Sequence, residues 1–156
     1  MKKLQMKLLQ ENGMLDKQEK KNYLDVSYGI GSFHTHKADL NAQFVEPKTG
    51  LIIRPTVGVN YSKNDYRMKD VQMRDESGDN FIYGNPKRFH DDYFSLLGQI
   101  EVGVANKSWA DAFFVSASYS KTDKELQTGA VQTKVYGMAE RNSDAWNISA
   151  HYQKRN

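Results

Sequence analysis

From Tyr23 onward, apolar and polar residues alternate along six stretches of the chain. A two-residue period is that of a β-strand with one apolar face, because successive side chains of a strand point to opposite sides. The alternation therefore predicts an all-β fold, an antiparallel meander of about six long strands. The six stretches are Leu24–Ile30, Lys37–Phe44, Leu51–Ser62, Tyr93–Val104, Phe113–Ser120 and Trp146–Gln153.

Two classes of all-β protein share this alternation. In a β-sandwich the apolar side chains form the core and the polar ones face water. In a membrane barrel the apolar side chains face lipid and the polar ones line the lumen. Strand length favours the barrel, since a twelve-residue strand tilted by about 40° rises about 30 Å, whereas a typical soluble strand has about 5–6 residues. A soluble all-β ligand-binding module, such as a sandwich or a lipocalin-like barrel, stays open as the alternative.

The connections between the predicted strands alternate in length. Val45–Gly50 and Ala105–Asp111 are short, whereas Lys63–Asp92 and Lys121–Asp144 are long and polar. Outer-membrane barrels have short turns on the periplasmic side, long loops on the outer side and aromatic girdles at both interfaces. Aromatic residues that suit such girdles lie at the strand ends, namely Tyr61, Tyr93, Phe94, Tyr119, Trp146 and Tyr152.

The number of strands limits the architecture. Six strands, or seven if the connection Lys63–Asp92 contains a short one, are fewer than the eight strands of the smallest closed membrane barrel. An open edge in lipid leaves backbone groups unpaired, at a cost of several kcal/mol each. The pattern therefore predicts part of a transmembrane β-barrel, which by itself would be an open curved sheet.

Composition and charge divide the 156-residue chain into two parts. Residues 1–21 contain six Lys and three acidic residues, whereas the remainder has sixteen of each sign. We expect residues 1–21 to be a polar leader, helical or disordered, without an export signal, and residues 22–156 to be a partial outer-membrane β-barrel. The mixed charges of the second part argue against nucleic-acid binding, which favours clustered Lys and Arg. The absence of Cys excludes disulfides and thiolate metal sites.

Histidine and acidic residues supply the only candidate metal ligands. His34 and His36 would place two imidazoles on one face of a strand, which suits a metal, but the sequence offers no third ligand. The acidic residues of the connection Lys63–Asp92 do not have the ligand spacing of a calcium-binding loop, so we expect a solvated surface loop there. These acidic residues are Asp70, Asp75, Glu76 and Asp79.

Catalytic chemistry is not indicated by any motif. His90, Asp91 and Asp92 could form an acid–base cluster, but no nucleophile with spaced partners accompanies them. We therefore predict no enzyme activity, no catalytic residues and no cofactor, metal or known substrate site. In a barrel, the polar positions that would face the lumen include Arg54, Asn60, Gln99 and Glu101.

Three segments resemble a known family. The segment Asn22–Phe44 is similar to the first barrel hairpin of TonB-dependent outer-membrane receptors, especially those of Bacteroidetes type. Its turn reads Gly-Ser-Phe-His-Thr, with His34 where the family usually has Gly. Gly50–Met68 resembles the next strand and its exit into a surface loop, and Asn106–Ala130 resembles the following turn, strand and loop. Together the resemblance covers about Asn22–Asn156, in the order of the family.

The resemblance implies an outer-membrane location and a role in transport. Such a receptor imports a scarce nutrient, such as an iron–siderophore, haem, cobalamin or glycan, with energy from an inner-membrane complex. The chain shows neither the family's signal peptide and energy-coupling box nor its plug domain, and it has fewer strands. We therefore expect a receptor fragment of early barrel strands that does not transport alone. Its partners would be outer-membrane lipid, the parent receptor's plug domain and remaining strands, and, through the parent, the TonB-type complex.

Overall fold

The computed structural model describes residues 21–128 and 133–154. The expectation for residues 1–20 of the leader lies outside the described residues. The described part contains eight strands joined by turns and loops. Their bounds are β1 (Tyr23–Gly31), β2 (Thr35–Glu46), β3 (Leu51–Ser62), β4 (Val71–Arg74), β5 (Phe81–Gly84), β6 (Tyr93–Ala105), β7 (Ala112–Thr128) and β8 (Val135–Gln153).

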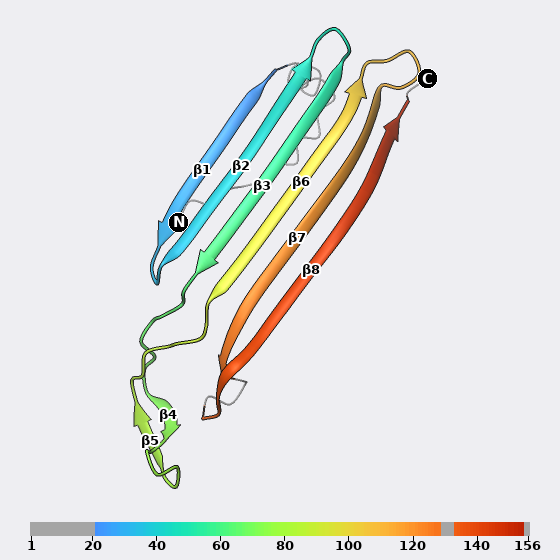
Figure 1. The fold of residues 1–156 in the computed structure, drawn as a ribbon. Coiled ribbons are helices and arrows are strands. Elements are labelled where there is room, and N and C mark those ends of the chain that lie inside the picture. The colour runs from blue at the N-terminus through green and yellow to red at the C-terminus, as the bar shows by residue number, and fades with distance from the viewer. Residues whose placement is uncertain (1–20, 129–132, 155–156) are drawn as a thin grey trace.

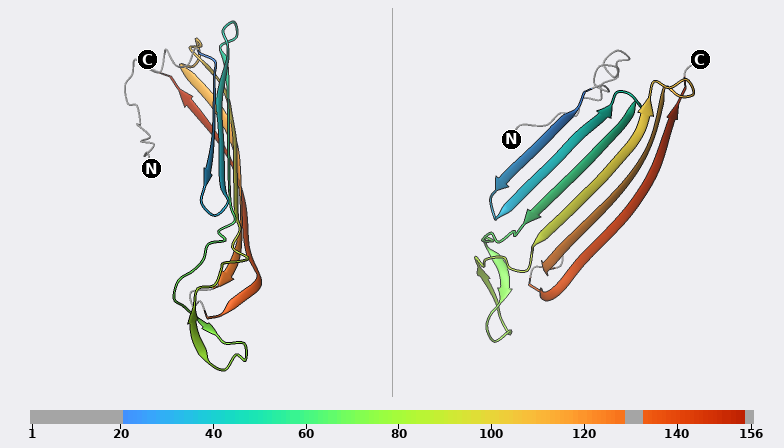
Figure 2. Two further views of the ribbon diagram at one scale, coloured as in Figure 1. Left: turned by 90° about the vertical axis from the view of Figure 1, so that its left-hand side faces the viewer. Right: turned by 45° about the horizontal axis from the view of Figure 1, so that its top comes forward.

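Six of these strands form one antiparallel meander sheet in the order β1-β2-β3-β6-β7-β8 (Figure 1). The sheet is open, because β1 and β8 are its two edges. The prediction of an all-β meander of six long strands is thus confirmed, and β3 has the bounds that the alternation predicts. Viewed along its edge, the sheet is a single curved layer (Figure 2).

The short strands β4 and β5 pair only with each other, in a hairpin between β3 and β6. This hairpin extends beyond the sheet at the end that carries the β1–β2 turn and the β7–β8 connection (Figure 1). We call this end the loop end. The opposite end, with the β2–β3 and β6–β7 turns, is the turn end.

The second of the two long connections was predicted wrongly. Residues 121–144 were expected to form a loop, but β7 and β8 continue through most of them, pairing from Lys121↔Asp144 to Thr128↔Val135. Most side chains in this part are polar, and its few apolar ones, such as Leu126, Val135 and Met138, do not recur at every second position over a strand length. Backbone hydrogen bonds extend the strands regardless of side-chain polarity, and no periodicity signal marks them.

Pro55 lies in the middle of β3, between two neighbouring strands. Pairing with β6 continues through Pro55↔Ile100, whereas the pairing of β2 with β3 skips from Asn41↔Thr56 to Phe44↔Ile53. Proline has no N–H to donate, so a break in one ladder is its expected effect. The sheet tolerates the residue because the other ladder stays intact.

Gly103 of β6 permits a close approach of β7. A Cβ at this position would collide with the carbonyl oxygen of Phe113 and with the Phe114 ring. Phe114 is only 6% exposed and packs with Ile52 and Ala105 in a small buried cluster at the turn end. The glycine therefore provides the space that the Phe114 ring occupies.

The described residues form no second layer. Every contact between strands joins neighbours within one of the two sheets. No large side chain in the described part is fully buried. The described residues contain no helix that is long and apolar enough to cross a membrane.

Candidate functional site

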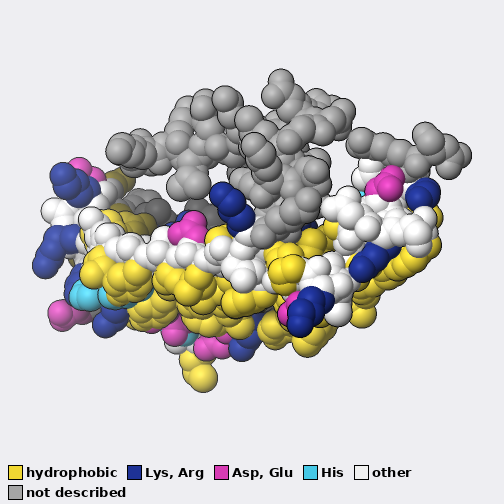
Figure 3. All heavy atoms as spheres, turned by 90° about the horizontal axis from the view of Figure 1, so that it is seen from above, with side chains coloured by type: hydrophobic (Ala, Val, Ile, Leu, Met, Phe, Trp, Pro, Cys, Tyr) yellow, Lys and Arg dark blue, Asp and Glu magenta, His cyan; other side chains and the backbone are white. Residues whose placement is uncertain are grey.

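The register of the six-stranded sheet brings all the alternating apolar residues to one face. Val26 pairs with Leu40, Leu40 with Val57, and the same face continues through Gly98 to Tyr119 and Trp146. Seen from above, hydrophobic side chains line one side of the sheet (Figure 3). We call this surface the apolar face. It consists of Leu24, Val26, Tyr28, Ile30, Ala38, Leu40, Ala42, Phe44, Leu51, Ile53, Pro55, Val57, Val59, Tyr61, Phe94, Leu96, Gly98, Ile100, Val102, Val104, Phe113, Val115, Ala117, Tyr119, Trp146, Ile148, Ala150 and Tyr152.

Many of the large side chains of the apolar face are exposed. Trp146 is 74% exposed and Ile148 is 78% exposed, and Leu24 and Ile30 are exposed to a similar degree. The register also places His36 on this face, between Ile30 and Tyr61 at its loop-end border, and Glu46 opposite Leu51 at its turn-end border. The positions of the apolar face between these borders include no Lys, Arg, Asp or Glu. A monomeric soluble protein rarely shows an apolar patch of this extent, and such a patch marks a surface for protein or lipid.

The borders of the apolar face run at a slant to the strands. The register aligns Trp146 of β8 with Val26 of β1, whereas the apolar residues of β1 begin four residues closer to the loop end, at Ile30. This displacement of about 14 Å over five strand spacings, about 24 Å, is a slant of about 30°. Strands of outer-membrane barrels are tilted by a similar angle, about 35–45°. A flat slab of lipid would cover a band with this slant.

The height of the apolar face also fits a bilayer. On β3 it extends from Leu51 to Tyr61, about 34 Å along the strand and about 29 Å after correction for the slant. The apolar band of outer-membrane barrels is about 25 Å tall. Aromatic residues lie at the borders, with Tyr61 and Phe94 paired at the loop end and Phe113 and Tyr152 paired at the turn end.

The opposite surface, which we call the polar face, contains a charged cluster near the turn end. Arg54 Nη1 donates to Glu101 Oε1 at 2.7 Å, and Arg54 Nε donates to Gln43 Oε1 at 2.8 Å. The guanidinium also lies 4.8 Å from the centre of the Phe114 ring, a cation–π distance. One arginine therefore connects β2, β3, β6 and β7. Arg54, Asn60, Gln99 and Glu101 all lie on the polar face, as the alternation predicts.

The loop between β3 and β6, residues 63–92, carries the β4–β5 hairpin, and we call it the long loop. Ion pairs attach its base to β7 at the loop end. Asp91 is buried, and its carboxylate accepts from Lys124 Nζ at 2.7 Å. Arg88 Nε lies 2.9 Å from the other Asp91 oxygen, in an ion pair that lacks hydrogen-bond geometry. Phe89 N donates to Gln127 Oε1 at 3.0 Å. These contacts fix where the loop leaves and re-enters the sheet, and the sequence pattern did not predict them.

His90, Asp91 and Asp92 do not form one acid–base cluster. His90 Nε2 lies 3.0 Å from the Ala139 carbonyl oxygen, whereas Asp92 accepts from the Tyr61 hydroxyl at 2.7 Å. Each of the three side chains thus has a different partner. Their arrangement holds the loop against β3, β7 and β8.

The two histidines of the first hairpin are also separate, and the prediction that they share one strand face is wrong. His34 lies in the turn before β2, with a left-handed φ of 56°, and its Nδ1 is 3.1 Å from Asp65 Oδ1. His36 lies within β2, and its Nδ1 is 2.7 Å from the Tyr28 hydroxyl oxygen. The turn backbone separates them, because two left-handed residues, Phe33 and His34, precede the strand.

Asp65 is the acceptor that links the first turn to the long loop. Lys87 Nζ lies 2.9 Å from Asp65 Oδ2, and His34 approaches the other oxygen. The hydrogen bond from Lys87, followed by that from His34, holds the pKa of Asp65 below its ordinary value. The carboxylate is therefore ionised and joins two chain segments that are far apart in sequence.

The acidic tip of the β4–β5 hairpin is a closed local network. Asp75 accepts from Asn80 Nδ2 at 2.9 Å and from the Ser77 hydroxyl at 2.8 Å. These bonds lower the pKa of Asp75 to about 2. The described residues include no group of three or more His, Asp or Glu that could hold a metal.

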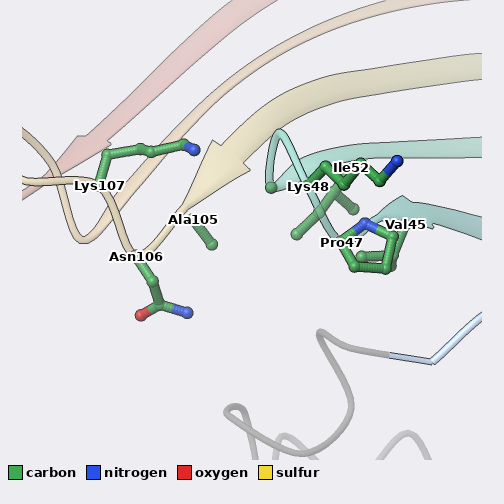
Figure 4. Close-up of a pocket in the computed structure, with 8 residues that line it drawn as sticks. Val45, Pro47, Lys48, Ile52, Ala105, Asn106 and Lys107 are labelled. Carbon is green, nitrogen blue, oxygen red and sulfur yellow. The ribbon is translucent and has the colours of Figure 1, made fainter.

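A depression of about 310 Å³ lies between the β2–β3 and β6–β7 turns (Figure 4). Its lining combines the apolar side chains of Val45, Ile52 and Ala105 with two lysines, Lys48 and Lys107. The two lysines have no acidic or nucleophilic side chain beside them in the lining, which indicates no catalytic grouping there. The main features of the described part are therefore the apolar face, the polar face, and the ion pairs that hold the long loop at the loop end.

Comparison with known proteins gave no matching family model, no related curated protein and no similar solved structure. The two faces of the sheet and the resemblance of its segments to a known family are therefore the features that bear on function.

Proposed function

We propose that the six-stranded sheet is a membrane-embedded segment of a TonB-dependent outer-membrane receptor, with the apolar face in lipid. The observation that carries this proposal is the apolar face, without Lys, Arg, Asp or Glu between its borders, on a single-layer sheet. In water this surface would need a second layer, and the described strands supply none. Lipid provides the cover without any further protein.

The slant and height of the apolar face support the same proposal. A second sheet packed on this face would not require the apolar residues to end along a straight line at a fixed angle to the strands. A bilayer imposes two parallel boundaries, with aromatic side chains favoured at both. The paired aromatic residues at the loop end and the turn end would then lie at the two boundaries.

The polar face would line the lumen of the barrel. In this family the lumen holds the plug domain, so the Arg54–Glu101 pair and Gln43 would face that domain. The remaining strands of the parent receptor would cover the open edges of β1 and β8, since six strands do not close a barrel. The long loop would then lie outside the cell, and the ion pairs of Asp91 and Asp65 would hold it against the end of the sheet.

The complete receptor would import a scarce nutrient, such as a siderophore, haem, cobalamin or glycan, with energy from the TonB-type complex. The sheet by itself would not transport. No side chain in the described part is assigned to the substrate, and no catalytic step is proposed.

Tryptophan quenching tests which face of the sheet meets lipid. The chain has two tryptophans, so Trp109→Phe leaves Trp146 as the single reporter. We expect lipids brominated in their acyl chains to quench Trp146 strongly when this variant is refolded into vesicles. The reason is that Trp146 is 74% exposed on the apolar face.

The neighbouring residue provides the matched control. Asn147 lies on the polar face, so the variant Trp109→Phe, Trp146→Phe, Asn147→Trp moves the reporter to the other side of the same strand. We expect little acyl-chain quenching there. Equal quenching at both positions, or none at either, would contradict the proposal. A chain that stays in solution as a monomer without lipid would favour the soluble binding module.

A further inference from the structure

The turn between β6 and β7 is held against the end of β8. Its tip spans Lys107–Ala110 and is closed by two backbone hydrogen bonds, of 2.8 and 3.2 Å, between its first and last residues. The Tyr152 hydroxyl donates to the Trp109 carbonyl oxygen at 2.9 Å, and Lys154 Nζ donates to the Ser108 carbonyl oxygen at 2.8 Å. Side chains from the end of β8 thus fix the position of the tip.

These contacts place the tip on the side of the sheet that carries the apolar face. Tyr152 belongs to that face, and it pairs there with Phe113. The Trp109 ring lies 5.7 Å from the Phe113 ring, centre to centre, in a tilted arrangement. Three aromatic rings and the ammonium group of Lys154 therefore gather at the turn-end border of the apolar face.

The aromatic residues of this border are exposed although their backbone is fixed. Trp109 is 53% exposed and Tyr152 is 57% exposed. The indole N–H of Trp109 has no hydrogen-bond partner among the described residues. Trp and Tyr are favoured at the level of lipid headgroups, where the ring meets acyl chains and the N–H or O–H reaches polar groups. The exposed rings are therefore suited to that level of a bilayer.

The charges at this border favour an anionic headgroup. The turn and the residue after β8 carry Lys107 and Lys154 against one acidic residue, Asp111. Within the described ranges neither lysine forms an ion pair, whereas at the loop end Lys121 lies 3.1 Å from Asp123. A lysine near an anionic lipid surface raises the affinity for that surface roughly fivefold.

We propose that the cluster of Trp109, Tyr152 and Lys154 binds the headgroup of an anionic phospholipid in the leaflet at the turn end. The inference deepens the proposed function and rests on it in one respect, namely that the apolar face lies in lipid. The ammonium group has three N–H donors, so it donates to the lipid phosphate while it keeps its bond to the Ser108 carbonyl oxygen. The acyl chains of the same lipid lie along the apolar face, next to the Phe113 ring.

Fluorescence quenching of Trp109 tests this proposal. The variant Trp146→Phe leaves Trp109 as the single reporter. The full chain is refolded into vesicles that mix phosphatidylcholine with phosphatidylglycerol, and one of the two lipids carries brominated acyl chains. Quenching by each brominated lipid in turn gives their relative association constant beside the cluster. We expect phosphatidylglycerol to be favoured roughly fivefold at low ionic strength, and added salt to weaken the preference.

Three lysine variants in the same background identify the source of the preference. Lys154→Gln keeps an N–H donor for the turn but removes the charge, so the relative association constant should fall toward one, whereas Lys154→Arg should preserve it. Lys37→Gln removes an equal charge from the polar face of β2 and should leave the constant unchanged. An equal loss in Lys37→Gln, or no loss in Lys154→Gln, would overturn the inference.

The loop-end border provides an internal reference. In Trp109→Phe the reporter is Trp146, and the nearby Lys121 is paired with Asp123, so we expect no preference between the two lipids there. If both tryptophans are quenched but Trp109 shows no preference, or both show the same one, the inference fails and the proposed membrane function stands. If neither tryptophan is quenched by either lipid, the sheet is not in lipid and the proposed function itself fails.

Discussion

A charge placed at the centre of the apolar face should cost far more than the same charge on the other side of the strand. The perturbation is Ile100→Arg. Ile100 lies near the middle of the apolar residues of β6, between Phe94 at the loop end and Val104 at the turn end. Its side chain is 49% exposed, so a new guanidinium would project outward from the sheet.

The two environments predict different magnitudes. An arginine that faces lipid at the bilayer midplane destabilises a barrel by about 2–4 kcal/mol, and the cost falls to about 0–1 kcal/mol near the interfaces. A substitution at an exposed position in water changes the free energy of unfolding by about 0.5 kcal/mol or less. The difference between lipid and water is therefore larger than the error of an unfolding experiment.

Two variants on the same strand serve as controls. Gln99→Arg places the charge on the polar face, beside Thr56 and Ser118, and should change the free energy of unfolding by about 0.5 kcal/mol or less. Val104→Arg places it on the apolar face at the border and should cost about 0–1 kcal/mol. The expected order of destabilisation is thus Ile100→Arg, then Val104→Arg, then Gln99→Arg.

Urea unfolding from vesicles, followed by tryptophan fluorescence, measures these differences. If Ile100→Arg and Gln99→Arg destabilise the sheet equally, the apolar face does not lie in lipid. If Val104→Arg destabilises the sheet as much as Ile100→Arg, the position of a residue between the borders of the apolar face does not correspond to its depth in a bilayer.

Three further predictions concern single positions. Gly103→Ala should destabilise the sheet by about 1–3 kcal/mol in urea unfolding, because the new methyl group meets the β7 backbone, whereas Gly98→Ala, which meets no atom within 4 Å, should change little. His34→Gly should be tolerated and His34→Val should cost about 1–2 kcal/mol in the same assay, since a φ of 56° disfavours a β-branched side chain. Because the pKa of Asp75 is lowered from 3.8 to about 2, its stabilising effect is present above pH 4 and is lost as the pH falls toward 2. Asn80→Ala should raise that midpoint, as carboxyl NMR titration would show, and an unchanged midpoint would contradict the assigned cause.

The sequence predicted the part of the fold in which side-chain polarity follows the strand period. The alternation of β3 and β6 located those strands, because one face of each strand is apolar and the other polar. It also placed Arg54 and Glu101 on one face, where they form an ion pair. Their mutual contact could not be predicted, because it depends on which residues of two strands are paired.

The loop end could not be predicted, because its contacts join segments that are distant in sequence. Asp65 meets His34, and Asp91 meets Lys124, across 31 and 33 residues. No local period links such pairs. One sequence feature pointed to the left-handed backbone at His34. The family that the first hairpin resembles usually has Gly at this position, and Gly adopts a positive φ without steric cost.

The outer limit of the apolar face is set by side chains rather than by the end of the strands. β7 and β8 stay paired for several residues beyond Tyr119 and Trp146, in an unchanged register as far as Leu126. At the next outward-facing pair the chemistry changes from two aromatic residues to Lys121 and Asp144. A sheet whose apolar face packed on a second layer of equal length would have no reason to change there. If the apolar face lies in lipid, as proposed, this change within one continuous ladder marks the point at which β7 and β8 leave the bilayer and enter water.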